Sequence, residues 1–327
     1  MFPFAAIACY HDIAKAQSTK QTIDIKMETY QRGVASMLQK FSKTRKISSY
    51  PWLAAAVAFS FQLPALAQTA DSAAAKDAAA TAPAAAAPAS PFTANVTIAS
   101  QYVSRGFRQT WGKPAIQGGV DYAHPSGLFA GTWMSSVSDH FIEGGSVEWD
   151  LYGGYTGTAG DFTYTGQIYY YLYPGAEASF AKTKYNYGEA VASLTYKWFN
   201  VKYWLTYTPD YFGYNSATLG IGSGQHSRGS GYLDLNGTFD LGSGYSLLLH
   251  YGNERVRNFS AYSFQDGKVA LSKAFDGGWT VTGAVTKGWG KNGVYDRYTT
   301  GVLNSAGQAE VSNPLATTLV LSLTKTF

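Results

Sequence analysis

The sequence predicts an all-β protein: one antiparallel barrel of about twelve strands that crosses a membrane. Three observations predict it. From residue 92 onward, apolar and polar residues alternate with a period of two, and the connections between these segments alternate between short and long. Charged residues make up only 14% of the 327 residues, whereas aromatic residues make up 16%. Soluble domains carry about 25% charged residues, so this composition favours a surface that faces lipid.

Residues 37–67 have the order of parts of a secretory signal peptide. Basic residues at 40–46 precede an apolar run at 52–61, and the small residues Ala65 and Ala67 follow around a leucine. This order predicts export and cleavage after Ala67, with a short buried helix as the alternative.

The other two N-terminal segments, residues 1–36 and 68–91, lack the pattern of a folded core. The residues before the signal peptide indicate a mis-assigned start codon, with Met37 or Met27 the true one, or else an unusually long leader. The residues after it are almost all Ala, Pro, Ser, Thr, Asp and Lys, which predicts a mobile periplasmic tail. The predicted order is an extension at 1–36, a signal peptide at 37–67, a linker at 68–91 and a barrel at 92–327.

Charge and cysteine content narrow the classes of function. Residues 1–91 hold nine Lys and Arg against five Asp and Glu, whereas residues 92–327 hold sixteen of each. The net charge of +4 therefore belongs to the leader and gives no reason to expect a nucleic-acid partner. The one cysteine, Cys9, lies upstream of the cleavage site, so a mature chain would have no disulfide, cysteine-bound metal or thiol nucleophile.

The alternation is clearest where Val147, Trp149 and Leu151 share one face and Glu148 and Asp150 share the other. Strands of a membrane barrel need apolar residues outside and polar residues inside, because lipid cannot form hydrogen bonds. The pattern predicts twelve strands, at 93–104, 114–124, 127–138, 146–157, 161–173, 185–197, 200–208, 230–241, 244–252, 263–275, 279–288 and 314–327.

The connections predict the orientation of the barrel. Short turns follow the even-numbered strands, at 125–126, 158–160, 198–199, 242–243 and 276–278. Longer connections follow the odd-numbered strands, at 105–113, 139–145, 174–184, 209–229, 253–262 and 289–313. This is typical of bacterial barrels with tight periplasmic turns and larger outer loops. An even strand number then places both termini in the periplasm.

The last predicted strand carries a candidate assembly signal. Its apolar face consists of Leu319, Leu321, Leu323 and the terminal Phe327. A terminal aromatic residue after alternating apolar residues resembles the signal read by the barrel assembly machinery, so we expect that partner. An ordinary amphipathic edge strand is the alternative. Lys325 interrupts the face, but so near the chain end its amine would extend to the membrane interface.

Two blocks of the predicted barrel, residues 95–109 (NVTIASQYVSRGFRQ) and 114–137 (PAIQGGVDYAHPSGLFAGTWMSSV), resemble the TorF-type porin family of proteobacteria. Pieces at 148–155, 169–175, 209–213 and 321–327 continue the likeness. The resemblance covers the whole predicted barrel. It implies the barrel architecture, but it implies no particular substrate and no catalytic residues.

The predicted inner wall contains the candidate pore-lining residues. A lumen of about twelve strands lies between filled eight-stranded barrels and open channels of 16–18 strands. By parity, the inward candidates are Asp121, Glu148, Asp150, Tyr169, Tyr171, Lys202, Asp234 and His250. Charges and aromatic rings around an open lumen would tune the passage of small polar solutes. The alternative is a closed lumen in which these charges pair and stabilise the barrel.

Arg105 and Arg108 lie where the first predicted strand leaves the membrane toward the outer surface. Folded inward, they would form a basic constriction that favours anions. Exposed, they would bind the phosphates of lipopolysaccharide, because guanidinium binds phosphate in bidentate fashion. Simple solvation in a loop is the third interpretation.

Two further classes of function remain as alternatives. A lipid hydrolase needs a serine, a histidine base and an orienting group on the lipid side. Among the histidines of the predicted mature chain, His124 lies at the turn that ends its strand, His140 and His226 lie in outer loops, and only His250 lies within a predicted strand, where it faces inward. The sequence has no Gly-x-Ser-x-Gly elbow, and no metal or phosphate-binding motif, so we expect no catalytic residues and no cofactor. A structural or adhesive barrel would use the long loops at 209–229 and 289–313.

Together, these features predict a barrel in the outer membrane of a Gram-negative bacterium, with outer-membrane lipids and lipopolysaccharide around it. The expected role is passive diffusion of small hydrophilic solutes through an aqueous lumen, without an energy source.

Overall fold

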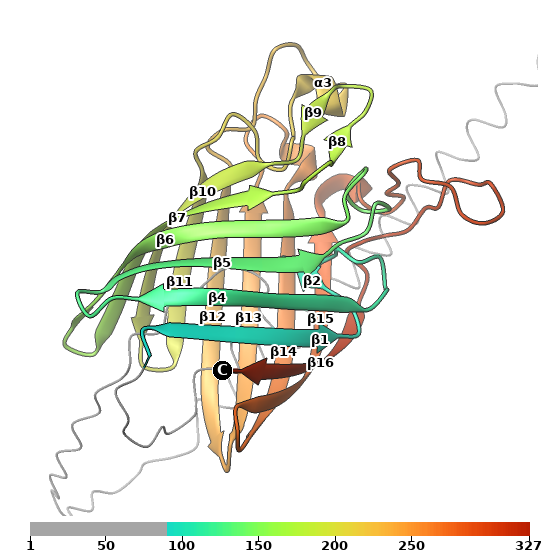
Figure 1. Ribbon diagram of the computed structural model, residues 1–327. Helices are drawn as coiled ribbons and strands as arrows, with labels where there is room; N and C mark the ends of the chain where they lie inside the picture. The colour runs from blue at the N-terminus through green and yellow to red at the C-terminus, as the bar shows by residue number, and fades with distance from the viewer. Residues whose placement is uncertain (1–89) are drawn as a thin grey trace, which may run out of the picture. The chain divides into compact units, whose positions relative to one another are not determined.

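The computed structural model describes residues 90–327, which form one closed antiparallel barrel of twelve strands (Figure 1). The fold class predicted from the sequence is therefore confirmed. The predicted extension, signal peptide and cleavage site lie outside the described residues, as does almost all of the predicted linker.

The barrel closes because its first and last strands pair, with Asn95 opposite Thr326 and Ala99 opposite Ser322. Every other pair joins barrel strands that are consecutive along the chain. The strands of the first half are β1 (Phe92–Ala99), β4 (Ala115–Ala123), β5 (Leu128–Ser136), β6 (Val147–Ala159), β7 (Phe162–Leu172) and β10 (Tyr187–Tyr196). Those of the second half are β11 (Phe199–Thr206), β12 (Gly231–Gly242), β13 (Tyr245–Arg255), β14 (Phe264–Phe275), β15 (Trp279–Gly290) and β16 (Thr318–Thr326).

All twelve predicted strands are present, and the first, ninth and last differ most from their predicted bounds. The first strand was predicted to reach residue 104, but β1 ends at Ala99 and the chain then turns inward. There it forms a small separate hairpin from β2 (Val103–Ser104) and β3 (Phe107–Arg108). The last strand was predicted from residue 314, but β16 begins at Thr318 because the preceding residues bond to this hairpin and to β15.

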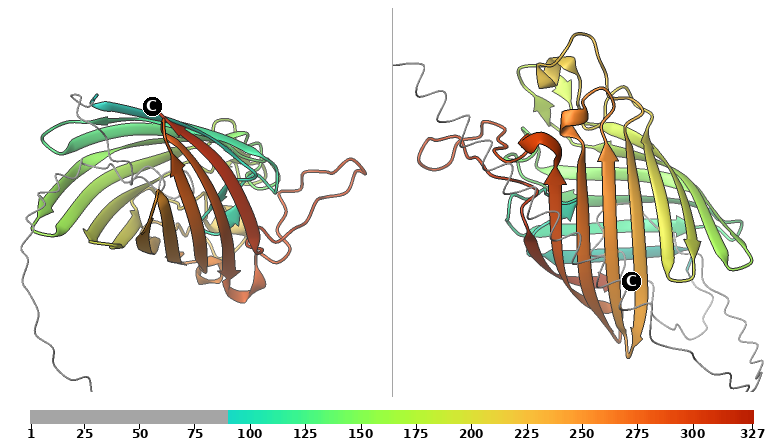
Figure 2. Two further views of the ribbon diagram at one scale, coloured as in Figure 1. Left: turned by 90° about the horizontal axis from the view of Figure 1, so that it is seen from below. Right: turned by 180° about the vertical axis from the view of Figure 1, so that it is seen from behind.

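The connections at the two ends of the barrel differ in length, as predicted (Figures 1 and 2). One end has tight turns and both ends of the barrel sequence, where Ala94 and Phe327 exchange backbone hydrogen bonds of 3.4 and 2.9 Å. The other end has the long loops, which contain β8 (Glu177–Ala178), β9 (Thr183–Lys184), α3 (Ser216–Leu219), η2 (Ser260–Tyr262) and η3 (Lys291–Gly293). Within residues 90–327, no helix is long and apolar enough to cross a membrane.

The outer surface has an aliphatic middle zone between two belts of aromatic side chains. The belt at the short-turn end includes Phe92, Tyr122, Phe162, Tyr196, Trp198, Tyr245, Phe275 and Trp279, all exposed. The belt at the loop end includes Tyr203, Tyr207, Tyr251 and Trp289, also exposed. Leucine, isoleucine and valine side chains occupy the zone between them. An apolar band flanked by aromatic girdles is the outer surface of a barrel that spans a bilayer.

The closing strand β16 presents its leucines to the outside. Leu319, Leu321 and Leu323 are 61%, 56% and 42% exposed. The Lys325 ammonium lies 5.6 Å from the ring of Trp279 and 5.1 Å from that of Phe327, and it donates to the carbonyl of Gly277 in the last tight turn. The Lys325 amine therefore lies within the aromatic belt at the short-turn end, while its contact with the membrane interface and recognition of the strand by the assembly machinery stay predictions.

Candidate functional site

The inner wall of the barrel is polar. On every barrel strand, the residues between the exposed apolar positions are mostly Thr, Ser, Asn, Gln, Tyr or charged. The structure places all eight sequence-predicted wall residues on this inner face: Asp121, Glu148, Asp150, Tyr169, Tyr171, Lys202, Asp234 and His250. Whether they line a water-filled path stays a prediction.

The connection after β1 folds into the barrel instead of outward. β2 and β3 pair through Ser104 and Phe107, and Arg105 and Gly106 form the two-residue turn between them. Both turn residues have positive φ, 46° and 80°, which is the backbone of the type I′ turn that fits the twist of a tight hairpin. The sequence therefore places an arginine at the tip of a rigid, inward-pointing hairpin.

The tip of the hairpin packs directly against the wall at β14 and β15. A Cβ atom on Gly106 would lie 2.8 Å from Cβ of Asp266 on β14 and 3.1 Å from Cα of Gly288 on β15. Only glycine fits this approach. At the base of the hairpin, the Arg108 amide donates to the carbonyl of Pro314 at 2.9 Å. The hairpin is thus held from both sides, and it narrows the lumen.

Arg105 is buried in a site formed by two carboxylates and several rings. Its guanidinium donates in bidentate fashion to Glu189, over 2.6 and 3.1 Å, and to Glu254 over 3.1 Å. It also lies 4.4 Å from the ring centroid of Tyr232 and 5.3 Å from that of Trp204. Charge-assisted bidentate bonds and cation–π contacts are both strengthened by burial.

This arrangement corrects one expectation from the sequence. Arg105 does fold inward, but it does not form a basic constriction, because two carboxylates surround its single charge. Arg108 lies outside this site and donates to the Ser312 hydroxyl and the Asn313 carbonyl, over 2.7 and 2.9 Å. Neither arginine is simply solvated in a loop.

A second charged network lies on β11 to β14. His250 is bonded through one ring nitrogen to Asp266 at 3.0 Å and through the other to Asp234 at 3.2 Å. The Lys202 ammonium lies 3.9 Å from Asp234, and the Tyr232 hydroxyl donates to Asp266 at 2.8 Å. Both nitrogens of the imidazole are therefore engaged by acceptors, which leaves neither available to activate a serine.

Two further predicted acids are bonded to tyrosines. Tyr102 and Tyr173 donate to the two oxygens of Glu148 over 2.9 and 3.1 Å. Tyr152 donates to Asp121 at 2.5 Å. Phenol hydroxyls thus bond the carboxylates of the wall, and this is the role the structure gives to part of the high tyrosine content.

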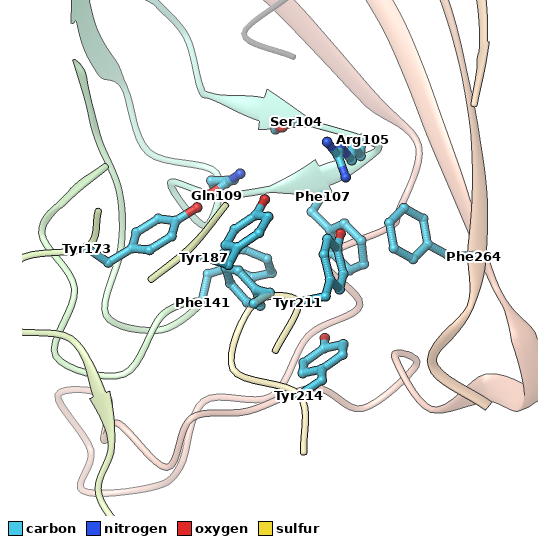
Figure 3. Close-up of a pocket in the computed structure, with 11 residues that line it drawn as sticks. Ser104, Arg105, Phe107, Gln109, Phe141, Tyr173, Tyr187, Tyr211, Tyr214 and Phe264 are labelled. Atoms are coloured by element: carbon cyan, nitrogen blue, oxygen red, sulfur yellow. The ribbon is translucent and has the colours of Figure 1, made fainter. Parts of the chain in front are cut away.

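Aromatic side chains from the long loops and from the loop ends of neighbouring strands fill the space beside the hairpin (Figure 3). The ring of Phe107 contacts those of Phe264 at 4.7 Å, Tyr295 at 5.0 Å and Phe141 at 5.6 Å. Next to them, a cavity of about 30 Å³ is lined by Arg105, Tyr187, Tyr211 and neighbouring rings. That volume has room for only a small number of water molecules, so the hairpin and these rings leave little free space where they meet.

The loop tyrosines stay neutral donors near physiological pH. Burial raises the pKa of the Tyr211 phenol and that of the Tyr295 phenol well above the usual value. Burial and the nearby Glu143 carboxylate raise the pKa of Tyr185 to about 12. The loop cluster therefore does not ionise through these groups in the range of ordinary growth conditions.

The candidates predicted from the sequence included Arg105 but not the four wall residues that surround its guanidinium. Glu189, Trp204 and Tyr232 lie at inward positions of predicted strands, and the same parity would have selected them. Glu254 was missed because the ninth strand was predicted to end at residue 252, whereas β13 continues to Arg255. Nothing in the local sequence shows that these four residues meet around one arginine.

The side chains of residues 90–327 were compared with the needs of a metal site and of a hydrolase built on His250. Of the side chains in that range, no three His, Cys, Asp or Glu are placed to hold a metal ion together. The partners of His250 are Tyr232, Asn236, Asp234 and Asp266, and none is a serine. The geometry therefore does not favour the hydrolase alternative.

The chain belongs to a family of bacterial proteins of unknown function (Gcw_chp), whose model matches residues 84–327. A comparison with curated proteins gave no match. Among solved structures, the chain is similar to the KdgM porin, with 7% identity, 72% of this chain and 99% of that chain covered, and a TM-score of 0.43.

Two other solved porins give comparable values. For the NanC porin, the identity is 11%, the coverage 72% and 98%, and the TM-score 0.44. For OccK5 of Pseudomonas aeruginosa, the identity is 14%, the coverage 72% and 66%, and the TM-score 0.33. Likeness at this level carries no argument about what this chain does, and the architecture rests on its own strand pairing.

Proposed function

We propose that this protein is an outer-membrane channel of a Gram-negative bacterium, through which small hydrophilic solutes diffuse passively. The observation that carries the proposal is the polar inner wall of a closed barrel whose outer surface is apolar between two aromatic belts. A wall of hydroxyls, amides and charges is suited to water and polar solutes. The resemblance to the TorF-type porin family supports the same role.

The inward hairpin sets the size of the path. Because β2 and β3 and the loop rings leave only a small cavity at their level, solutes pass when the hairpin moves or tilts. The hairpin is joined to the wall by side-chain contacts and backbone bonds at its base, and it is not part of the barrel sheet. It can therefore move without breaking a strand pair.

The charge of the wall favours cations. Eight inward carboxylates are found on the described strands, at Asp121, Glu148, Asp150, Glu189, Asp234, Asp240, Glu254 and Asp266. Three permanent cations accompany them, at Lys202, Lys268 and Arg105. Excess negative charge in a narrow lumen raises the local concentration of cations. This replaces the anion preference that an inward Arg105 suggested from the sequence.

The orientation and the surroundings are proposed from the same geometry. The short turns and both ends of the barrel face the periplasm, where the assembly machinery would read the closing strand. At the loop end, Arg255, Lys287 and Lys291 lie on the outer face around Trp289, and none of the three forms an ion pair within residues 90–327. They, and not Arg105, are suited to the phosphates of lipopolysaccharide. Replacing Arg255 and Lys291 with Gln should reduce the amount of lipopolysaccharide that co-purifies.

Planar-bilayer recording tests the channel directly. The chain from residue 68 onward is compared with a variant in which residues 103–108 are replaced by a Gly-Ser segment of equal length. We expect discrete current steps from both, with a conductance at least about twofold larger in the variant because its lumen is wider. If neither protein conducts, the barrel is closed, and the channel proposal is wrong.

A closed structural or adhesive barrel is the second candidate, and the packed loop rings favour it. In that case the long connection between β15 and β16 would be the contact surface, and removal of the hairpin would still give no current.

A further inference from the structure

The site around Arg105 is formed by four adjacent strands of the wall. Glu189 lies on β10, Trp204 on β11, Tyr232 on β12 and Glu254 on β13. In the register of the sheet, Trp204 is directly opposite Tyr232, and Tyr232 is directly opposite Glu254. Neighbouring strands are about 4.8 Å apart, so two rings flanked by two carboxylates form one continuous surface, which we call the cradle.

The cradle has the chemistry of a guanidinium site. Two parallel bonds from Nη1 and Nη2 of Arg105 reach the two oxygens of Glu189, and Nη1 also bonds to Glu254. The face of Tyr232 lies 4.4 Å from the central carbon of the same group. A planar fork of donors that also stacks on a ring describes a guanidinium and not an ammonium, which is a compact point charge.

The wall orients the cradle without help from the hairpin. Tyr171 on β7 donates its hydroxyl to Oε2 of Glu189 over 3.1 Å. The ring of Tyr171 stacks on that of Tyr187, with centroids 4.3 Å apart. Both tyrosines belong to strands of the barrel, so Glu189 would keep its orientation if Arg105 left.

The present occupant is held under strain and can be replaced. Arg105 has a φ of 46°, a left-handed backbone that is unfavourable for a residue with a side chain, and the hairpin that carries it lies outside the barrel sheet. A free solute would not bear this penalty. The small cavity beside Arg105 and Tyr211 provides space for water at the same place.

We propose that the cradle is a guanidinium-binding site of the channel, that Arg105 occupies it as a tethered ligand, and that solutes bearing a guanidinium group displace Arg105 and are the class that the channel admits. The transport part of this inference rests on the proposed function, whereas the binding part does not. The binding part is therefore tested without any measurement of current.

The test uses the full barrel chain in detergent micelles and calorimetric titration with methylguanidinium chloride. In Arg105→Ala the cradle is empty, and we expect saturable binding of one methylguanidinium per chain. The wild type should bind at least about tenfold more weakly, because Arg105 competes for the same charge-assisted hydrogen bonds. Ethylammonium chloride, which has the same charge but no planar fork, should also bind at least about tenfold more weakly to Arg105→Ala.

Two double variants locate the site. Arg105→Ala/Glu189→Gln should lose at least about tenfold in affinity for methylguanidinium, because the bidentate partner loses its charge. Arg105→Ala/Asp240→Asn is the matched control, since Asp240 is a carboxylate near the short-turn end of β12 and away from the cradle. It should bind as Arg105→Ala does. Equal affinity in both double variants, or no binding by Arg105→Ala, would overturn the proposal.

If Arg105→Ala does not fold on its own, its refolding yield tests the same proposal. Empty buried carboxylates repel each other, so refolding of this variant into micelles should need a cation in the cradle. Methylguanidinium should then raise the folded yield, read as the heat-modifiable band on gels, whereas ethylammonium at the same concentration should not. A yield that responds equally to both salts, or to neither, would contradict the proposal.

The channel proposal and the guanidinium-site proposal are contradicted by different results. If wild-type channels conduct but Arg105→Ala neither binds nor responds to methylguanidinium, the guanidinium site is wrong and the channel stands. If Arg105→Ala binds methylguanidinium but no variant conducts, the channel is wrong, and with it the transport half of this inference.

Discussion

At the scale of the residue, Arg105 and Gly106 determine how the interior is filled. An arginine with positive φ costs roughly 1 kcal/mol, and it is tolerated here because two carboxylates and two rings hold its guanidinium. Gly106 is required for a different reason, since the wall leaves no room for a Cβ atom. The Arg105 side chain therefore binds to the wall, and Gly106 allows the backbone of the turn to lie close to the wall.

Gly106→Ala should loosen the hairpin. The added Cβ would lie 2.8 Å from Cβ of Asp266 in a backbone with a φ of 80°, so the hairpin must retreat from the wall at a cost of about 1–3 kcal/mol. We expect a larger single-channel conductance and a lower temperature of heat modification. Gly166→Ala on β7 is the control, because a Cβ there meets no atom within 4 Å. Unchanged conductance in Gly106→Ala would show that the hairpin does not limit the path.

At the scale of the element, the twelve wall strands and the inner hairpin differ in how far the sequence specifies them. A wall strand repeats its pattern over eight to 13 residues, so alternation alone predicts it. The strands β2 and β3 have two residues each, too few for any period. The partners of Arg105 lie 84 and 149 residues away along the chain, so only the closed barrel brings them together.

The closing strand gives a prediction at this scale. Phe327→Ala should slow insertion of the protein into outer membranes, because the terminal aromatic residue is the part of β16 that resembles the assembly signal. Phe275→Ala is the matched control, since Phe275 is also an exposed aromatic residue, at the short-turn end of β14. The measurement is the fraction of folded protein over time in a cell-envelope insertion assay. Equal insertion rates for the two variants would show that Phe327 has no role in assembly beyond that of other aromatic residues in the belt.

At the scale of the whole molecule, the strands of the barrel wall could be predicted from the sequence, whereas the packing of side chains inside the barrel could not. Period-two alternation, connection lengths and the apolar face of β16 each describe the wall, and the structure confirms them. The interior depends on side chains from loops, whose sequence shows no period. The aromatic cluster joins Phe107 of the hairpin, Phe141 of the connection between β5 and β6, and Phe264 at the start of β14, and no local pattern relates them.

The excess of inward carboxylates gives a prediction for the molecule as a whole. In a salt gradient across a bilayer, the wild type should show a reversal potential of the sign expected for a cation-selective pore. Glu148→Gln/Asp150→Asn should shift that potential toward zero, and the shift should be greater at low ionic strength, where screening is weak. Asp161→Asn, in an exposed tight turn, should leave it unchanged. A wild-type reversal potential of anion-selective sign would refute the charge argument.

The pairing of β1 with β16 has a consequence for biogenesis. The seam joins the first strand to the last, so the cylinder can close only after the final residues have been delivered. The hairpin next to β1 is synthesised before the rest of the interior, since β1 is the first strand of the barrel sequence. Glu189 and Glu254 also need a cation before water leaves them. We therefore expect the earliest part of the barrel sequence to serve as an internal template on which the later strands assemble.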